Sequence, residues 1–216
     1  MLLDAVEWLG HSGFRIRAGA AVVYIDPYRV GDGPAADLIL ITHGHYDHFS
    51  PQDVGRLTGK RTLVVAPAAV AERLSGRVQS IAPGEAIEPD GVRGVEVRAI
   101  AAYNTSKRDA SRKVLHPRDA DGVGYEVRVG GERLYHSGDT DVIPEMDEVA
   151  GVEVALLAVS GVYVMTPGEA AEAARRIQPH VAVPMHWGEL IGTREDAEAF
   201  ARRAPVEVRI LEKVPG

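Results

Sequence analysis

Short runs of apolar residues that end in turn-forming residues recur along the first part of the chain. Residues 14–17 alternate between apolar and basic side chains, residues 22–25 form an apolar run before Asp26-Pro27, and residues 38–41 are all aliphatic. Alternation is typical of a half-buried strand, whereas a run that is apolar on both faces is typical of a strand buried on both sides. These patterns predict that the first forty residues form β-strands.

Helix signals then alternate with strand signals, which is typical of an α/β fold. Ser50 before a proline predicts a helix start, because Ser is a favoured N-cap and Pro a favoured first helical residue. A capping box of Thr166 and Glu169 predicts a helix to about residue 177, and Thr193 with Asp196 predicts another. The other expected elements here are a helix at 68–74 and strands at 63–65, 78–81, 154–159, 181–183 and 206–211.

The middle of the chain has strand patterns on either side of a long segment without periodicity. Residues 92–99, 123–129 and 132–136 are expected strands, and Gly130-Gly131 is a hairpin turn signal between the last two. Residues 103–118 show neither helical nor strand periodicity. A loop of this length inside a compact domain is usually functional or mobile.

Composition and charge narrow the class of protein. The chain has 216 residues, 45% hydrophobic and 25% charged, which fits one domain over residues 1–216. The net charge of −7 argues against a nucleic-acid tract, and no apolar stretch is long enough for a membrane span. Asp4 stands where a signal peptide would carry basic residues, so we expect a cytoplasmic protein. The absence of cysteine excludes disulfides, thiolate metal sites and a cysteine nucleophile.

The strongest chemical signal lies directly after the aliphatic run at 38–41. His43, His45, Asp47 and His48 form the pattern H-x-H-x-D-H. Residues two apart in an extended chain point to the same side, so His43 and His45 are expected to face one metal ion. Imidazole and carboxylate suit Zn²⁺, and also Mn²⁺, Fe²⁺ or Ni²⁺. The alternative, a solvated polar loop, would leave four such groups unpaired beside a buried strand.

A site for two metal ions needs further ligands, because a catalytic zinc ion takes about three protein ligands and keeps one position open. His116, Asp139 and His186 each stand next to the end of an expected strand, where α/β proteins present catalytic groups. His136 is a rival to His116 in the same region. We favour His116, because His136 follows the alternation of its own strand and lies only three residues before Asp139.

This ordered set of residues resembles the metallo-β-lactamase superfamily over nearly the whole chain. The stretches WLGHSGF (8–14) and YIDP (24–27) are similar to its compact branch of ascorbate-6-phosphate lactonase-like proteins. The resemblance implies an αββα sandwich of mixed sheets with helices outside, and a binuclear metal site at its edge. It implies that one metal ion is held by His43, His45 and His116, a second by Asp47, His48 and His186, and that Asp139 bridges the two ions. Zinc is the first candidate for both ions.

Three further residues receive expected roles. His11 lies in the stretch shared with the compact branch, which implies a catalytic, substrate-side role without metal contact; on its own it would be an ordinary turn residue. Asp26 is expected to support the metal-binding loops from behind, and the alternative is a strand-ending turn with Pro27. His180, after a proline at the start of a strand, is expected to be structural.

The expected activity is hydrolysis. Two metal ions lower the pKa of a shared water and polarise the oxygen of a substrate, so a bound hydroxide could attack an ester, lactone or phosphodiester of a small molecule. Asp47 could assist by accepting a proton or a hydrogen bond. One alternative is an iron-loaded redox enzyme with the same ligands, although the intact H-x-H-x-D-H pattern favours hydrolysis. The other is a non-catalytic, metal-binding member of the fold.

The segment 103–118 adds an expectation about the substrate. It carries Lys107, Arg108, Arg112, Lys113 and Arg118, so it is strongly basic within an acidic protein. We expect this loop to attract an anionic substrate, such as a phosphorylated one. The alternative is a solvated loop whose charges only keep it soluble. The sequence does not indicate the oligomeric state.

Overall fold

Two β-sheets form the centre of the structure, a computed structural model that describes residues 2–214. The first sheet has six strands in the order of the chain, and only β1, β2 and β3 are joined antiparallel. The strands of this sheet are β1 (Val6–Gly10), β2 (Gly13–Ala18), β3 (Ala21–Ile25), β4 (Ala36–Leu40), β5 (Thr58–Ala66) and β6 (Val78–Ser80).

The second sheet has seven strands and is also mixed, in the order β13-β12-β11-β10-β9-β8-β7. Strands β7 to β10 pair antiparallel, whereas β10 to β13 pair parallel. Its strands are β7 (Ala86–Ile87), β8 (Val95–Ala101), β9 (Val123–Val129), β10 (Glu132–His136), β11 (Val154–Ala158), β12 (Val181–Met185) and β13 (Glu207–Val208).

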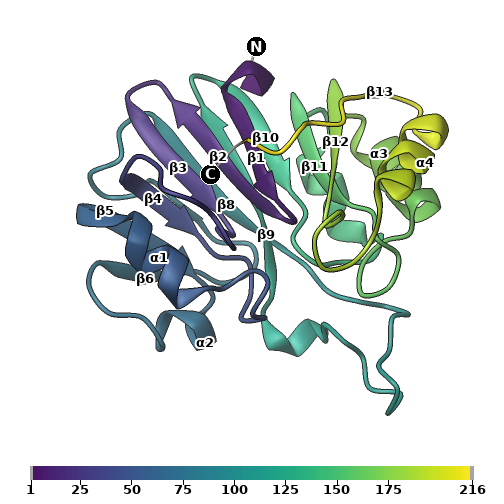
Figure 1. The fold of residues 1–216 in the computed structure, drawn as a ribbon, viewed down its shortest axis with the longest axis horizontal. Coiled ribbons are helices and arrows are strands. Elements are labelled where there is room, and N and C mark those ends of the chain that lie inside the picture. Colours follow the sequence, from purple (N-terminus) through teal and green to yellow (C-terminus); the bar gives the residue numbers. More distant parts are fainter. Residues whose placement is uncertain (1, 215–216) are drawn as a thin grey trace.

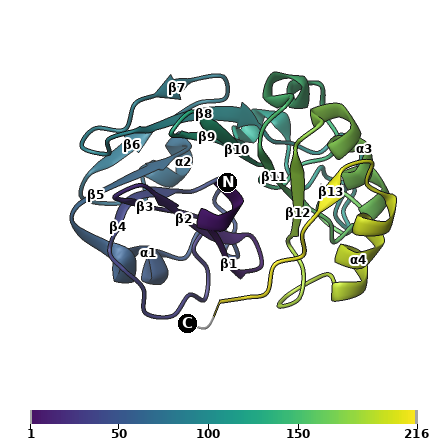
Figure 2. The ribbon, with the colours of Figure 1, turned by 90° about the horizontal axis from the view of Figure 1, so that it is seen from above.

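The helices lie outside the two sheets (Figures 1 and 2). Helices α1 (Pro51–Leu57) and α2 (Ala68–Ala71) pack on the first sheet, and α3 (Pro167–Ile177) and α4 (Arg194–Arg203) pack on the second. Short 3₁₀ helices complete the chain at η1 (Leu2–Ala5), η2 (Arg118–Ala120) and η3 (Pro144–Val149). This arrangement of two mixed sheets between outer helices confirms the predicted αββα class.

Strand β4 shows why its residues had to be apolar on both faces. Leu38 and Leu40 belong to the core between the two sheets, whereas Ile39 and Ile41 pack beneath α1 and α2. All four side chains are fully buried. Each such side chain stabilises the fold by about 1.5–3 kcal/mol through removal of apolar surface from water. The run that sets the position of the histidine cluster is therefore held from both sides.

Some predicted boundaries differ from the structure. The helix expected at 68–74 is the single turn α2, and the strand expected at 206–211 is only β13. The strand expected at 92–99 begins at Val95, because Gly91 and Gly94 adopt the left-handed backbone conformation of turns. Strand β1 was not singled out, because its Glu7 interrupts the apolar pattern. That residues 1–216 form one domain stays a prediction. None of the described helices is long and apolar enough to cross a membrane.

The strands that lead to the predicted ligands all end at one edge of the sandwich, opposite the N-terminus in Figure 1. In the first sheet β1, β3 and β4 run in the same direction, and in the second β8, β10, β11 and β12 do. The loops after these seven strands therefore meet at this edge. The segment 103–118, teal in Figure 1, projects from the same edge and contains a short bridge between Arg108 and Val114.

Candidate metal centre

Seven side chains with metal-binding atoms, the seven predicted from the sequence, gather at this edge in two adjacent groups, together with His11. In each group, the potential ligand atoms all lie within 4.8 Å of one another. The first group consists of His43, His45, His116 and Asp139, and the second of His11, Asp47, His48 and His186. The segments that supply these residues are far apart in the sequence.

In the first group, three ring nitrogens face one another at short distance. Nδ1 of His45 lies 3.0 Å from Nε2 of His43 and 3.1 Å from Nε2 of His116. Burial lowers the pKa of His43 well below its usual value and also lowers the pKa of His116, so both rings are neutral at pH 7. Neutral rings present lone pairs, and lone pairs that converge this closely fit a shared cation.

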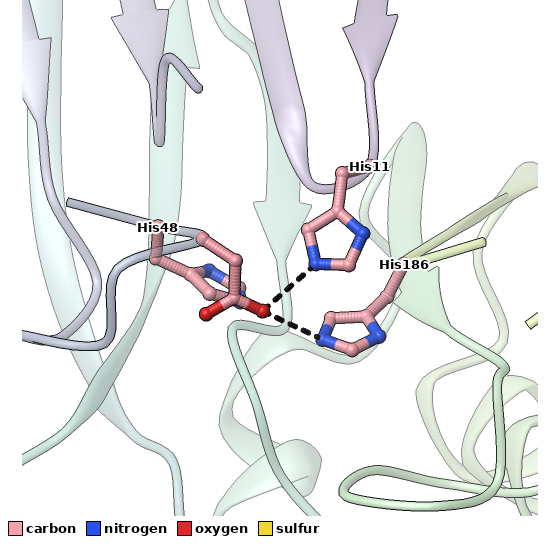
Figure 3. A group of neighbouring side chains, drawn as sticks. His11, His48 and His186 are labelled. Carbon is pink, nitrogen blue, oxygen red and sulfur yellow. Dashed lines mark hydrogen bonds and ion pairs between the residues drawn. The ribbon is translucent and has the colours of Figure 1, made fainter. Parts of the chain in front are cut away.

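In the second group, three rings point toward one another from separate loops (Figure 3). Nε2 of His11 donates to Oδ2 of Asp47 at 3.0 Å, and Nε2 of His186 lies 3.8 Å from the same oxygen. Burial raises the pKa of Asp47, but the hydrogen bond from His11 and the charge of His48 outweigh it and lower this pKa to about 2. Asp47 is therefore a carboxylate at neutral pH.

Asp139 belongs to the first group and also lies close to the second. Its Oδ2 is 3.4 Å from Nε2 of His116 in the first group and 3.3 Å from Nε2 of His186 in the second. Its Oδ1 is 3.1 Å from Nε2 of His48. Burial raises the pKa of Asp139, but His186 and His48 outweigh it and hold the pKa well below the usual range. A buried carboxylate between two sets of ring nitrogens has the position that a bridging ligand requires.

Unpartnered buried atoms test whether these residues fit a metal ion. Nε2 of His48, Nε2 of His186 and Oδ1 of Asp139 are buried and make no hydrogen bond. Leaving a buried polar atom unpaired costs roughly 1–3 kcal/mol, so a cluster of such atoms is costly unless a cation satisfies them. The atoms are of the type that divalent metal ions bind, and the site fits such an ion.

Buried partners behind the histidines fix which nitrogen faces the site. Nδ1 of His48 donates to Asp26 at 2.7 Å, and Asp26 also accepts from the amide and hydroxyl of Thr42. Nδ1 of His186 contacts the Ser160 hydroxyl at 2.9 Å. With Nδ1 engaged, Nε2 of each ring is the nitrogen that faces the site. The supporting position predicted for Asp26 agrees with this geometry.

Asn104 performs the same task for His116 and connects it to a wider network. Its Oδ1 accepts from Nδ1 of His116 at 2.7 Å, and its Nδ2 donates to Asp141 at 3.1 Å. Asp141 in turn accepts from the backbone amides of Thr105 and Ser106. The first part of the segment 103–118 is therefore anchored to the site.

Three side chains of the site stand on strained backbone. His11, Asp26 and His186 have φ of 50°, 45° and 60°, in the left-handed region that non-glycine residues rarely adopt. Each follows the end of a strand, and the reversal turns the side chain back toward the edge of the sandwich. Such strain costs of order 1–3 kcal/mol per residue and clusters at functional sites.

The other two histidines of the chain lie outside both groups. His136 is fully buried, its Nε2 donates to the Ser12 carbonyl at 2.9 Å, and its Nδ1 accepts from the Gly138 amide at 3.1 Å. Both ring nitrogens are thus occupied by backbone, and His116 holds the place beside His43 and His45. The His180 side chain is exposed at the start of β12.

Two cavities adjoin the groups. One of about 270 Å³ is lined by His43, His45, His116 and Asp139 together with apolar residues of the 115–123 segment. The other, of about 240 Å³, is lined by Asp47 and by three of the same residues. His11 is fully buried, lines neither cavity and contacts Asp47 through its Nε2, and its substrate-side role stays a prediction.

Sequence reasoning missed Asn104, Thr42, Ser160 and Asp141. Each lies within three residues of a strand end or of a predicted ligand, which is the one signal that the sequence offers for them. Their side-chain types are too common in loops for that signal to single them out.

Comparisons with known proteins agree with the fold and the site. The sequence pattern of the beta-lactamase superfamily domain matches residues 5–186. A UPF0173 metal-dependent hydrolase of Methanopyrus kandleri is 33% identical, with 96% of each chain covered, and one of Thermococcus kodakarensis is 32% identical over 98% of this chain and 96% of that protein. The crystal structure of a candidate metal-dependent hydrolase of Parabacteroides distasonis superposes with a TM-score of 0.84 at 28% identity, covering 97% of this chain and 93% of that one.

The matched region contains every predicted ligand, from His43 to His186. The relatives are matched over nearly their whole length, so the likeness extends beyond a local motif. The chain belongs to the metallo-β-lactamase superfamily, as one of its metal-dependent hydrolases.

Proposed function

We propose that this protein hydrolyses an ester, lactone or phosphodiester of a small molecule at a centre of two divalent metal ions. The observation that carries the proposal is the position of Asp139, which belongs to the first group of metal-binding side chains and lies 3.3 Å from His186 of the second. The first ion would be held by His43, His45 and His116, and the second by Asp47, His48 and His186, with Asp139 shared. Zinc suits these nitrogen and carboxylate ligands best, and manganese, iron and nickel also suit them.

Two ions in such a centre supply a water of lowered pKa and polarise the substrate oxygen that takes up negative charge. The chain's own residues orient the reactants. Asp47 lines the cavity of about 240 Å³ and is ionised, so it can accept a hydrogen bond from the attacking water. His11 holds the Asp47 carboxylate in place through its 3.0 Å hydrogen bond.

The expected substrate is a small molecule, because the two cavities beside the site hold about 270 and 240 Å³. The further expectation of a phosphorylated substrate depends on the cations of segment 103–118. Lys107 binds Glu169, and Arg118 binds Glu145, so neither is free to attract a phosphate. The cations of this segment that could attract a phosphate are Arg108, Arg112 and Lys113. A cytoplasmic location also stays a proposal.

The test is a panel of esters, lactones and phosphodiesters presented to protein loaded separately with zinc, manganese and iron. Turnover of one class that depends on the added metal would support the proposal. Asp47→Asn should lower kcat by about 10²-fold or more, since it alters both a ligand and the orientation of the water. His180→Ala, which changes an exposed histidine outside the site, should retain full activity. Full metal occupancy with no turnover on any class would overturn the hydrolase proposal.

A further inference from the structure

Large apolar side chains are exposed at the mouth of the metal centre. Among the residues that the structure describes, the exposed large apolar side chains are Tyr46 at 68%, Val162 at 52%, Tyr163 at 43% and Leu190 at 36%. All four lie on loops that follow β4, β11 and β12, and the loops after β4 and β12 also carry predicted ligands. Apolar side chains that are exposed together, rather than scattered singly over the surface, mark binding sites.

Two of these rings line the cavity of about 240 Å³. Tyr46 and Tyr163 form its wall with Leu115, and the rest of the lining is His45, Asp47, His116 and Asp139. The apolar surfaces and the predicted metal ligands thus face the same space. A cavity of about 150 Å³ lined by apolar side chains holds a benzene ring, so this one has room for a substituted ring.

The two tyrosines are supported from behind. The ring of Tyr28 meets the ring of Tyr46 edge-on, with centroids 6.1 Å apart. The Tyr163 carbonyl accepts a hydrogen bond from Nδ2 of Asn104 at 3.3 Å, and Asn104 also binds His116. The position of Tyr163 is therefore coupled to the first group of ligands.

The charge around the cavities points to an uncharged ligand group. Within residues 2–214, no lysine or arginine lines either cavity beside the metal centre. Lys107 is held by Glu169 and Asp141 instead. Apart from the proposed metal ions, a phosphate or carboxylate placed against Tyr46 and Tyr163 would lose water without gaining a cationic side chain, which favours an uncharged group at that wall.

We propose that Tyr46, Leu115 and Tyr163, termed here the apolar cradle, bind an uncharged ring of the substrate next to its scissile ester or lactone group. This inference rests on the proposed function and narrows it to small neutral esters and lactones with an aromatic or cyclic substituent. For a lactone, water adds its hydroxyl to the carbonyl carbon, the ring C–O bond breaks, and the ring oxygen takes the proton. The product is a hydroxy acid, and no oxidant or reductant is needed.

The experiment compares three lactones that share one scissile ring: γ-butyrolactone, its γ-phenyl derivative and its γ-carboxy derivative. With zinc-loaded protein, we expect kcat/KM for the γ-phenyl lactone to exceed that for γ-butyrolactone by about tenfold or more, because burial of a phenyl ring strengthens binding. We expect the γ-carboxy lactone to be the poorest substrate. Equal values for all three lactones, or a preference for the carboxylate, would overturn the cradle.

Variants assign the preference to the cradle. The double variant Tyr46→Ser with Tyr163→Ser should reduce the ratio of γ-phenyl to unsubstituted kcat/KM about tenfold, whereas Tyr46→Phe, which keeps the ring, should retain it. Val162→Ser is the matched control, because Val162 is exposed on the loop of Tyr163 but lines neither cavity. A preference that survives the double variant, or that is lost with Val162→Ser, would place the binding surface elsewhere.

A binding measurement separates this inference from the proposed function. The cyclic ether 2-phenyltetrahydrofuran has the shape of the γ-phenyl lactone but no scissile bond, and its contacts are observable by saturation-transfer NMR with tetrahydrofuran as reference. Binding of the phenyl ether that is lost in the double variant, without turnover of any lactone, would keep the cradle and overturn the hydrolase proposal. Turnover of lactones without binding of the phenyl ether would keep the hydrolase proposal and overturn the apolar cradle.

Discussion

At the residue scale, the site depends on histidines whose two nitrogens have separate tasks. Nδ1 of His48, His116 and His186 is engaged by Asp26, Asn104 and Ser160, and Nε2 of each ring faces the neighbouring groups. The cluster at residues 43–48 could be singled out because the spacing H-x-H-x-D-H is rare, whereas His116, Asp139 and His186 were chosen from strand ends and from the resemblance to the superfamily. That these residues bind metal stays a prediction. Their partners could not be predicted, since Asn104 and Ser160 acquire their roles only when separate strands bring them beside the rings.

Asn104→Ala tests the task of the partner residue. The change leaves His116 in place but removes the group that fixes its orientation, so we expect metal affinity at the first group to fall roughly 10–100-fold. Competition with a chelating indicator measures the affinity. His180→Ala should leave it unchanged, because that ring is exposed outside the site. Unaltered affinity in Asn104→Ala would show that His116 needs no such support.

At the scale of elements, the turn after β10 packs closely against the backbone of β9. Gly138 lies in the turn after β10 with φ of 59°, and an added Cβ there would come within 2.5 Å of the Val123 carbonyl oxygen. The adjacent residue is Asp139, so the turn also sets the position of the proposed bridging carboxylate. Sequence patterns predicted β9 and β10, but they could not reveal that the two backbones approach this closely.

Gly138→Ala should therefore be strongly destabilising. We expect the free energy of unfolding to fall by roughly 3 kcal/mol or more, from the left-handed backbone and the overlap with β9 together. Gly130→Ala is the matched control, since Gly130 has φ of 58° but open space around it, and its cost should be about 1 kcal/mol. Urea unfolding measures the stability of both variants. Equal losses in the free energy of unfolding would contradict the role of the close contact between this turn and β9.

A second prediction concerns helix α3 and the segment 103–118. Burial raises the pKa of Glu169, but the hydrogen bonds from Lys107 and from the Thr166 amide outweigh it and lower this pKa below its usual value. A carboxyl whose pKa is lower in the folded state stabilises the fold above its unfolded pKa, about 4.3, and this contribution disappears as the pH falls through the folded pKa.

Glu169→Gln should accordingly lower stability at pH 7 by about 1 kcal/mol or less, since the side chain is partly exposed. The difference from the unaltered protein should shrink as the pH falls from about 5 to about 3. Thermal unfolding across this range measures it, with Glu172→Gln on the same helix as the control. A difference that stays constant with pH would contradict the pairing of Glu169 with Lys107.

At the scale of the whole molecule, both sheets deliver their strand ends to one edge, and the metal centre lies where those ends meet. The resemblance to the superfamily anticipated this architecture, and local patterns anticipated most strands and helices. The sequence could not predict how deeply each side chain of the site is buried. His11 is fully buried beside Asp47, whereas Tyr46, between the predicted ligands His45 and Asp47, is mostly exposed. The burial of these loop side chains depends on contacts between segments far apart in the sequence. The spacing of apolar residues along the chain does not predict such contacts.

The central claim is that the two groups form one binuclear centre, and metal content measures it most directly. Mass spectrometry of protein purified without added metal or chelator should give about two divalent ions per chain, since each group offers the ligands for one ion. His48→Ala, which removes a ligand of the second group only, should retain about one. No bound metal in either protein after reconstitution, or loss of both ions in the variant with its fold intact, would contradict two groups that share Asp139.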